Sequence, residues 1–113
     1  MTILITACID VKPELCADLL RSAEPFIAAA LAEPGSREYA WSIDPRKPGR
    51  IRVLEEWDDE ASLQAHFDNA AYTNMRDHIT TAIVGAQSMK YLIAKSESVY
   101  DSQGKPRAKF LNT

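Results

Sequence analysis

The sequence is poor in cysteine and has no long hydrophobic run. Only two of its 113 residues are cysteines, Cys8 and Cys16, and their spacing fits neither a disulfide framework nor a C-x-x-C metal site. Both lie in apolar segments, where a free thiol packs as a small hydrophobic group. No apolar stretch approaches the ~18 residues of a membrane span, and no secretory signal is recognisable. We therefore predict a cytoplasmic protein that does not bind membranes.

An excess of positive charge and the common cofactor motifs are absent as well. The 13 basic and 16 acidic residues give a net charge of −3, which argues against nucleic acid as a partner. The chain has no glycine-rich nucleotide loop, no H-x-x-x-H zinc helix and no serine nucleophile elbow. The residues therefore indicate neither a metal nor a bound cofactor.

Hydrophobic patterning predicts four strands. They are marked by β-branched runs or by alternating apolar residues, at residues 2–11, 37–44, 50–57 and 88–99. The alternation places Tyr39 and Trp41 on one face of the second strand. It places Val53, Glu55 and Trp57 on one face of the third strand.

Two helical stretches separate these strands. The first is kinked or divided at Pro25, because the proline ring removes a backbone hydrogen bond. The second follows an N-cap at Asp58 or Asp59, breaks near Asn69 and continues to Gly85.

This order of elements is typical of a ferredoxin-like βαββαβ domain of the α+β class, with a four-stranded antiparallel sheet and helices on one face. The open face carries either the set that includes Tyr39 and Trp41 or the opposite set, and we expect either to be too apolar for water. A homodimer in which two open sheet faces pack as a dimeric α+β barrel would cover it. The domain spans residues 1–99, and the tail 100–113 is loose or packed on the partner subunit.

Four short motifs resemble those of one family, the antibiotic biosynthesis monooxygenases. Glu33-Pro34-Gly35-Ser36-Arg37-Glu38-Tyr39 resembles its E-P-G-x-x-x-Y motif. Its D-P, E-x-W and L-x-x-H-F motifs are matched by Asp44-Pro45, Glu55-Glu56-Trp57 and Leu63-Gln64-Ala65-His66-Phe67. The resemblance covers about residues 3–98 and implies a dimeric α+β barrel, which becomes the expected place for a ligand pocket. The family includes quinol and anthrone oxygenases, haem-degrading enzymes and members without assigned chemistry.

Departures from the family patterns reduce the number of activities that the resemblance implies. Where haem-degrading members carry an Asn, a Trp and a haem-ligating His, this chain has Thr6, His66 and Arg76, so haem degradation is not expected. Only half of the anthrone-oxidising set is matched, since its four positions are Val53, Trp57, Leu63 and Arg76 here. The resemblance thus favours a monooxygenase that needs no cofactor and oxidises a small quinol-like or polyphenolic aromatic with O₂.

Such an oxygenase needs a dry aromatic pocket, a base and a group that holds a phenolate. His66 is the candidate base, and Arg76 is the candidate for stabilising the oxyanion. The candidate substrate-binding residues are aromatic or acidic: Tyr39, Trp41, Glu55, Trp57 and Tyr72. Structural roles are open as well: a hydrogen-bonded His66, a core Trp57, a paired Glu55 and a solvated Arg76.

Two other functions stay open at this point. One is a non-catalytic, small-molecule-binding or structural dimer, which would bind aromatic ligands without consuming oxygen. The other is an isomerase or decarboxylase on the same barrel, whose products would contain no added oxygen.

Overall fold

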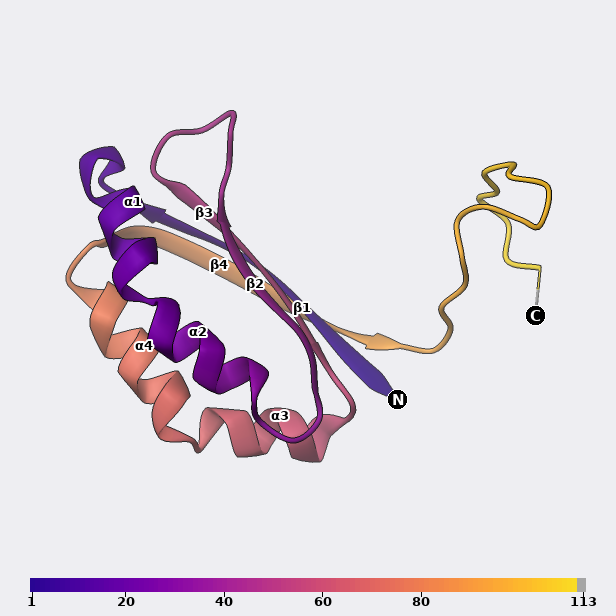
Figure 1. The fold of residues 1–113 in the computed structure, drawn as a ribbon, viewed down its shortest axis with the longest axis horizontal. Helices are drawn as coiled ribbons and strands as arrows, with labels where there is room; N and C mark the ends of the chain where they lie inside the picture. The colour runs from indigo at the N-terminus through magenta and orange to yellow at the C-terminus, as the bar shows by residue number, and fades with distance from the viewer. Residues whose placement is uncertain (112–113) are drawn as a thin grey trace.

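The computed structural model describes residues 1–111 and contains a single antiparallel sheet. Its strands are β1 (Thr2–Val11), β2 (Ser36–Ile43), β3 (Arg50–Trp57) and β4 (Ile83–Ile93), in the spatial order β2-β3-β1-β4. The helices α1 (Pro13–Ser22), α2 (Glu24–Leu31), α3 (Glu60–Phe67) and α4 (Ala70–Thr80) all lie on one side of the sheet (Figure 1). This arrangement confirms the ferredoxin-like α+β fold.

Side-chain alternation decides which face of the sheet the helices cover. Ile5 pairs with Glu55, and Glu55 pairs with Tyr39, so the three side chains share a face. Tyr39 and Ile5 are buried, as is Trp57 two residues along β3. The sheet's large aromatic residues therefore pack under the helices.

The opposite set of side chains forms the open face of the sheet. It includes a cross-strand row of Ala40, Leu54, Thr6 and Met89. Leu54 is 41% exposed and Met89 is 60% exposed, but Arg52 lies on the same face. The open face is thus a mixture of apolar and polar groups. It is less apolar than the sequence led us to expect, and the aromatic residues of β2 and β3 give no argument for a dimer.

Local capping explains where the helices begin. The carboxylate of Asp59 accepts a hydrogen bond from the Ser62 backbone at 2.8 Å and so caps α3. The break near Asn69 is also confirmed, because its side chain caps α4. Pro25 occupies the first turn of α2, where a missing backbone N–H has no cost, and the division predicted there falls at Ala23.

The last strand begins and ends earlier than predicted. β4 starts at Ile83 and ends at Ile93, and α4 ends at Thr80, so Gly85 lies inside β4 and does not end a helix. The prediction was wrong because Ile83 follows Ile79 at helical spacing. In the structure a turn at Thr81 and Ala82 separates them, and Ile83 pairs with Val11 in the sheet.

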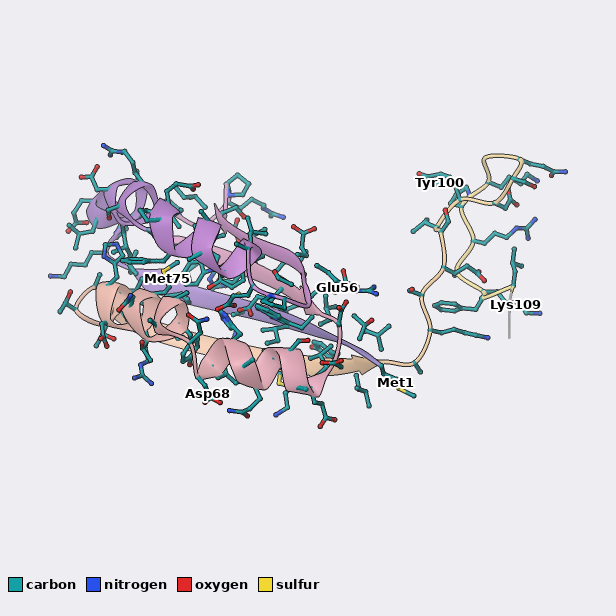
Figure 2. The ribbon with its side chains drawn as sticks, turned by 60° about the horizontal axis from the view of Figure 1, so that its bottom comes forward. Met1, Glu56, Asp68, Met75, Tyr100 and Lys109 are labelled. Carbon is teal, nitrogen blue, oxygen red and sulfur yellow. The ribbon has the colours of Figure 1, made fainter. Side chains whose placement is uncertain are left out.

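Beyond β4 the chain leaves the domain as an extended tail (Figure 1). Figure 2 places Tyr100 and Lys109 on this tail, away from the helices. A short bridge pairs Tyr100 with Pro106, and Val99 and Leu111 are largely exposed. The tail therefore holds a small turn of its own, and the last two residues of the predicted segment 100–113 lie outside the described part of the chain.

Candidate active site

A cavity of about 350 Å³ lies between the sheet and α4. All four strands contribute to its walls, together with the end of α3 and one side of α4. Most of the lining is aliphatic or aromatic, and Met75 of α4, which Figure 2 labels between the two helix pairs, forms part of it. Its ionisable side chains apart from tyrosine are Glu55 and Arg76. These walls suit a planar apolar ligand with a polar edge.

A second hollow, of about 580 Å³, lies on the open face of the sheet. Small and polar side chains line much of it, among them Thr6, Ser42 and Gln87. No aromatic residue is among its lining residues in the described part of the chain. The aromatic cavity therefore lies on the helix side of the sheet, not between two sheets as the resemblance led us to expect.

Five of the seven candidate residues line the helix-side cavity: Tyr39, Trp41, Glu55, Tyr72 and Arg76. The other two, His66 and Trp57, do not line it. They lie close behind its wall, because both rings contact that of Tyr39. The structure thus brings five of the candidate residues together around one cavity, but the sequence did not separate the residues of its wall from those of the layer behind it.

Glu55 is the only carboxylic acid among the described residues that line the cavity. Its Oε1 accepts a hydrogen bond from the Trp57 indole Nε1–H at 3.0 Å. Burial raises the pKa of Glu55, and this hydrogen bond only partly opposes the effect. The neighbouring Tyr39 has a raised pKa too, first because it is buried and then because of the Glu55 charge. The Tyr39 hydroxyl therefore stays protonated near neutral pH.

His66 occupies the centre of an aromatic cluster behind this wall. It is 2% exposed, and its ring stacks on Trp57 with 4.5 Å between centroids. The rings of Tyr39 and Tyr72 make T-shaped contacts with it, each with 5.5 Å between centroids. Its Nδ1 lies 2.5 Å from Oε2 of Glu33, and since a carboxylate can only accept, Nδ1–H donates. The structural role of His66, as a hydrogen-bonded core residue, is the one that these contacts favour.

Arg76 and Trp41 bring hydrogen-bond donors to the cavity. The guanidinium of Arg76 lies over the Tyr72 ring, 5.7 Å from its centroid, and no carboxylate within residues 1–111 pairs with it. The indole N–H of Trp41 is buried beside the Tyr39 hydroxyl without a well-formed hydrogen bond. Both groups can therefore donate to a ligand.

A model of the family described as antibiotic biosynthesis monooxygenase matches residues 2–78, which include β1 to α3 and most of α4. The chain belongs to this family. The match contains both the cavity's aromatic wall and the cluster around His66.

Individual proteins and solved structures also resemble this chain. A Bacillus subtilis (strain 168) protein named "Putative monooxygenase YcnE" is 30% identical over 70 residues, which are 62% of this chain and 74% of that protein. A conserved protein from Methanosarcina mazei Go1 superposes with a TM-score of 0.74 at 24% identity, over 80% of this chain and 91% of that one. Rv0793 from Mycobacterium tuberculosis superposes with a TM-score of 0.76 at 17% identity, over 87% of this chain and 100% of that one. At such identities the two structures support the fold alone.

Sequence reasoning missed two contributors to the site. The first is the part of β4 that precedes Ser88, because Ile83, Ala86 and Gln87 line the cavity but lie ahead of the predicted start of that strand. Glu33 was read only as part of a turn motif, whereas its carboxylate holds His66. A buried histidine needs a hydrogen-bond partner, and that requirement was the available signal.

Metal-binding clusters and membrane-spanning helices are both absent from the described residues. Residues 1–111 contain no group of three or more His, Cys, Asp or Glu side chains placed to hold a metal ion. None of the helices described is both long and apolar enough to cross a membrane.

Proposed function

We propose that this protein is a monooxygenase that needs no cofactor and oxidises a small quinol-like or polyphenolic aromatic with O₂. The helix-side cavity carries the proposal, because it combines aromatic walls with one carboxylate and one guanidinium. Tyr39, Trp41 and Tyr72 offer ring faces and edges to a planar ligand. The name of the Bacillus subtilis relative, a putative monooxygenase, also supports this reaction class.

The reaction balances without an external reductant. A quinol supplies four electrons to one O₂ molecule, one oxygen atom enters the ring, and the other leaves as water. The organic product is a hydroxyquinone. The protein has to remove a phenolic proton, hold the resulting electron-rich anion and exclude water. The cavity offers a carboxylate, a guanidinium and largely apolar walls for these three tasks.

Arg76 is the residue we assign to the anion. A guanidinium at a largely apolar wall stabilises a developing phenolate more strongly than water does, because the surroundings screen the charge less. His66 is assigned a supporting role behind the wall, where it fixes the Trp57 ring.

The working unit in this proposal is a homodimer formed through the open sheet face. The exposed Leu54, Met89 and Tyr91 side chains lie on that face, and a partner's sheet would cover them. The tail from residue 100 also carries exposed apolar groups and extends away from its own domain, so it would pack on the partner subunit.

Oxygen uptake with a panel of hydroquinones tests the proposal. The wild type should consume O₂ in equal amounts with the quinol, at a rate well above that of the quinol alone. Arg76→Leu should lower turnover by about 100-fold, the usual effect of removing one transition-state donor. Arg46→Leu, which removes an exposed guanidinium far from the cavity, should leave turnover unchanged.

Three results would contradict the proposal. Uptake at the background rate with every quinol would do so, and binding of aromatic ligands without uptake would identify a binding protein instead. Products without added oxygen would point to isomerase or decarboxylase chemistry.

A further inference from the structure

We propose that Glu55 is the group that takes the phenolic proton of the ligand, with one carboxyl oxygen fixed by Trp57 and the other left for the ligand. This inference rests on the proposed function in one respect, namely that the ligand is a phenol. Glu55 was predicted only as a substrate contact, and the family resemblance assigned it no catalytic role.

The position of Glu55 sets it apart from the other candidate bases. Among the described residues that line the cavity it is the only carboxylic acid, and no histidine lines that cavity. His66, the base favoured by residue type, is already bonded to Glu33 and has Trp57 stacked on one face. A proton acceptor has to reach the proton it removes, so position decides in favour of Glu55.

The hydrogen bond from Trp57 orients the Glu55 carboxylate. Trp57 is completely buried, and its ring stacks on that of His66 with 4.5 Å between centroids and makes a T-shaped contact with Tyr39 at 6.5 Å between centroids. The indole N–H therefore binds Oε1 from a fixed place. A carboxylate accepts more than one hydrogen bond, so Oε2 stays available for a phenol O–H.

The proton transfer is balanced within the cavity. The ligand's O–H bond breaks, a new O–H bond forms on Glu55, and the electron pair stays on the ligand oxygen as a phenolate. The Arg76 guanidinium, which lines the same cavity from α4, offsets the charge of that phenolate. Because burial raises the pKa of Glu55, its carboxylate is a stronger base than an exposed one.

Charged and titratable groups from several elements lie on the same side of the sheet as Glu55. They are Tyr39 of β2, His66 of α3, Tyr72 and Arg76 of α4, Lys90 of β4, and Glu33 just ahead of β2. All are kept in the variants below, so any change in pH dependence between the variants and the wild type belongs to Glu55 or to its bond with Trp57.

The test is the pH dependence of 4-nitrophenol binding, a probe that O₂ does not oxidise. Neutral and anionic nitrophenol absorb at different wavelengths, so the bound form can be identified. The wild type should take up the neutral form and hold it as the anion, with its proton on Glu55. It should lose affinity as the free probe ionises, because an anion would then meet the charged Glu55 carboxylate. Glu55→Gln should bind the anion at least tenfold better than the wild type does. Glu60→Gln, at an exposed position on α3, should follow the wild type.

A second variant guards against a folding defect in Glu55→Gln. Trp57→Phe keeps the carboxylate but removes its N–H donor, so the preference for neutral nitrophenol should become stronger. The proposal is overturned if Glu55→Gln has the wild-type pH profile, or if the wild type does not bind nitrophenol at millimolar concentration. Since no step of this assay uses O₂, a failure of oxygen uptake with the nitrophenol result intact would refute the oxygenase proposal and leave the role of Glu55 in place.

Discussion

Replacing His66 by alanine should destabilise the fold rather than stop the chemistry. The side chain is 1% exposed and donates to the Glu33 carboxylate, which is itself only 10% exposed. Removal leaves that carboxylate without its partner, and breaking such a buried pair typically costs about 3–5 kcal/mol. The lost ring contacts with Trp57, Tyr39 and Tyr72 add to this cost.

The size of this loss makes it easy to measure. Domains of this kind have total stabilities of about 5–15 kcal/mol, so the midpoint of unfolding should fall by more than about 10 °C. Urea titration followed by tryptophan fluorescence gives the free energy directly, since Trp57 contacts the substituted ring.

A double-mutant cycle separates the pair from the rest of the cluster. Once His66 is alanine, Glu33→Gln should restore part of the stability, because it removes the charge left unpaired, and the coupling should reach about 1–3 kcal/mol. Additive effects would refute the pairing argument. A His66→Ala protein with wild-type stability and no turnover would refute the structural role and restore His66 as the base.

Three further predictions follow from single features of the structure. Since burial raises the pKa of Glu55, its contribution to stability is complete below the ordinary glutamate pKa and is lost as the pH rises through the pKa of the folded state. The free energy of unfolding of Glu55→Gln should therefore rise relative to that of the wild type between pH 4 and pH 8. A difference independent of pH in urea titrations would contradict this. Met89→Asp places a charge on the open sheet face of each subunit and should convert the proposed dimer into monomers, as measured by light scattering after gel filtration, whereas an unchanged mass would place the interface elsewhere. Gly35→Ala forces a side chain onto a residue with φ of 81° and against Ser62, so thermal melts should show a loss of more than about 2 kcal/mol, while Gly104→Ala, with φ of 77° and open space, should lose only about 1 kcal/mol.

Much of the fold follows from hydrophobic patterning and helix capping, which can be recognised in the sequence. β1 and β3 have the predicted bounds, because the spacing of their apolar residues fits a strand and not a helix. Asp59 and Asn69 cap the helices as their types predict. The error at β4 arose where two periods coincide, since Ile79 and Ile83 fit a helix as well as a turn followed by a strand.

The site was harder to predict because it depends on how deeply each side chain is buried, which residue type alone does not determine. Alternation placed Glu55 and Trp57 on one face of their strand, but it could not say that this face also carries Tyr39 or that it lies under the helices. Nor could it say that Trp57 turns its N–H to Glu55 while His66 turns to Glu33. Those choices are made by long-range packing, which pattern alone does not encode.

Isotope labelling tests the central claim most directly. The wild-type protein would be mixed with a quinol under ¹⁸O₂, and the product would be analysed by mass spectrometry. The account predicts a hydroxyquinone that carries one labelled oxygen atom, formed only slowly by Arg76→Leu. A product whose added oxygen comes from solvent water, or one without added oxygen, would contradict it.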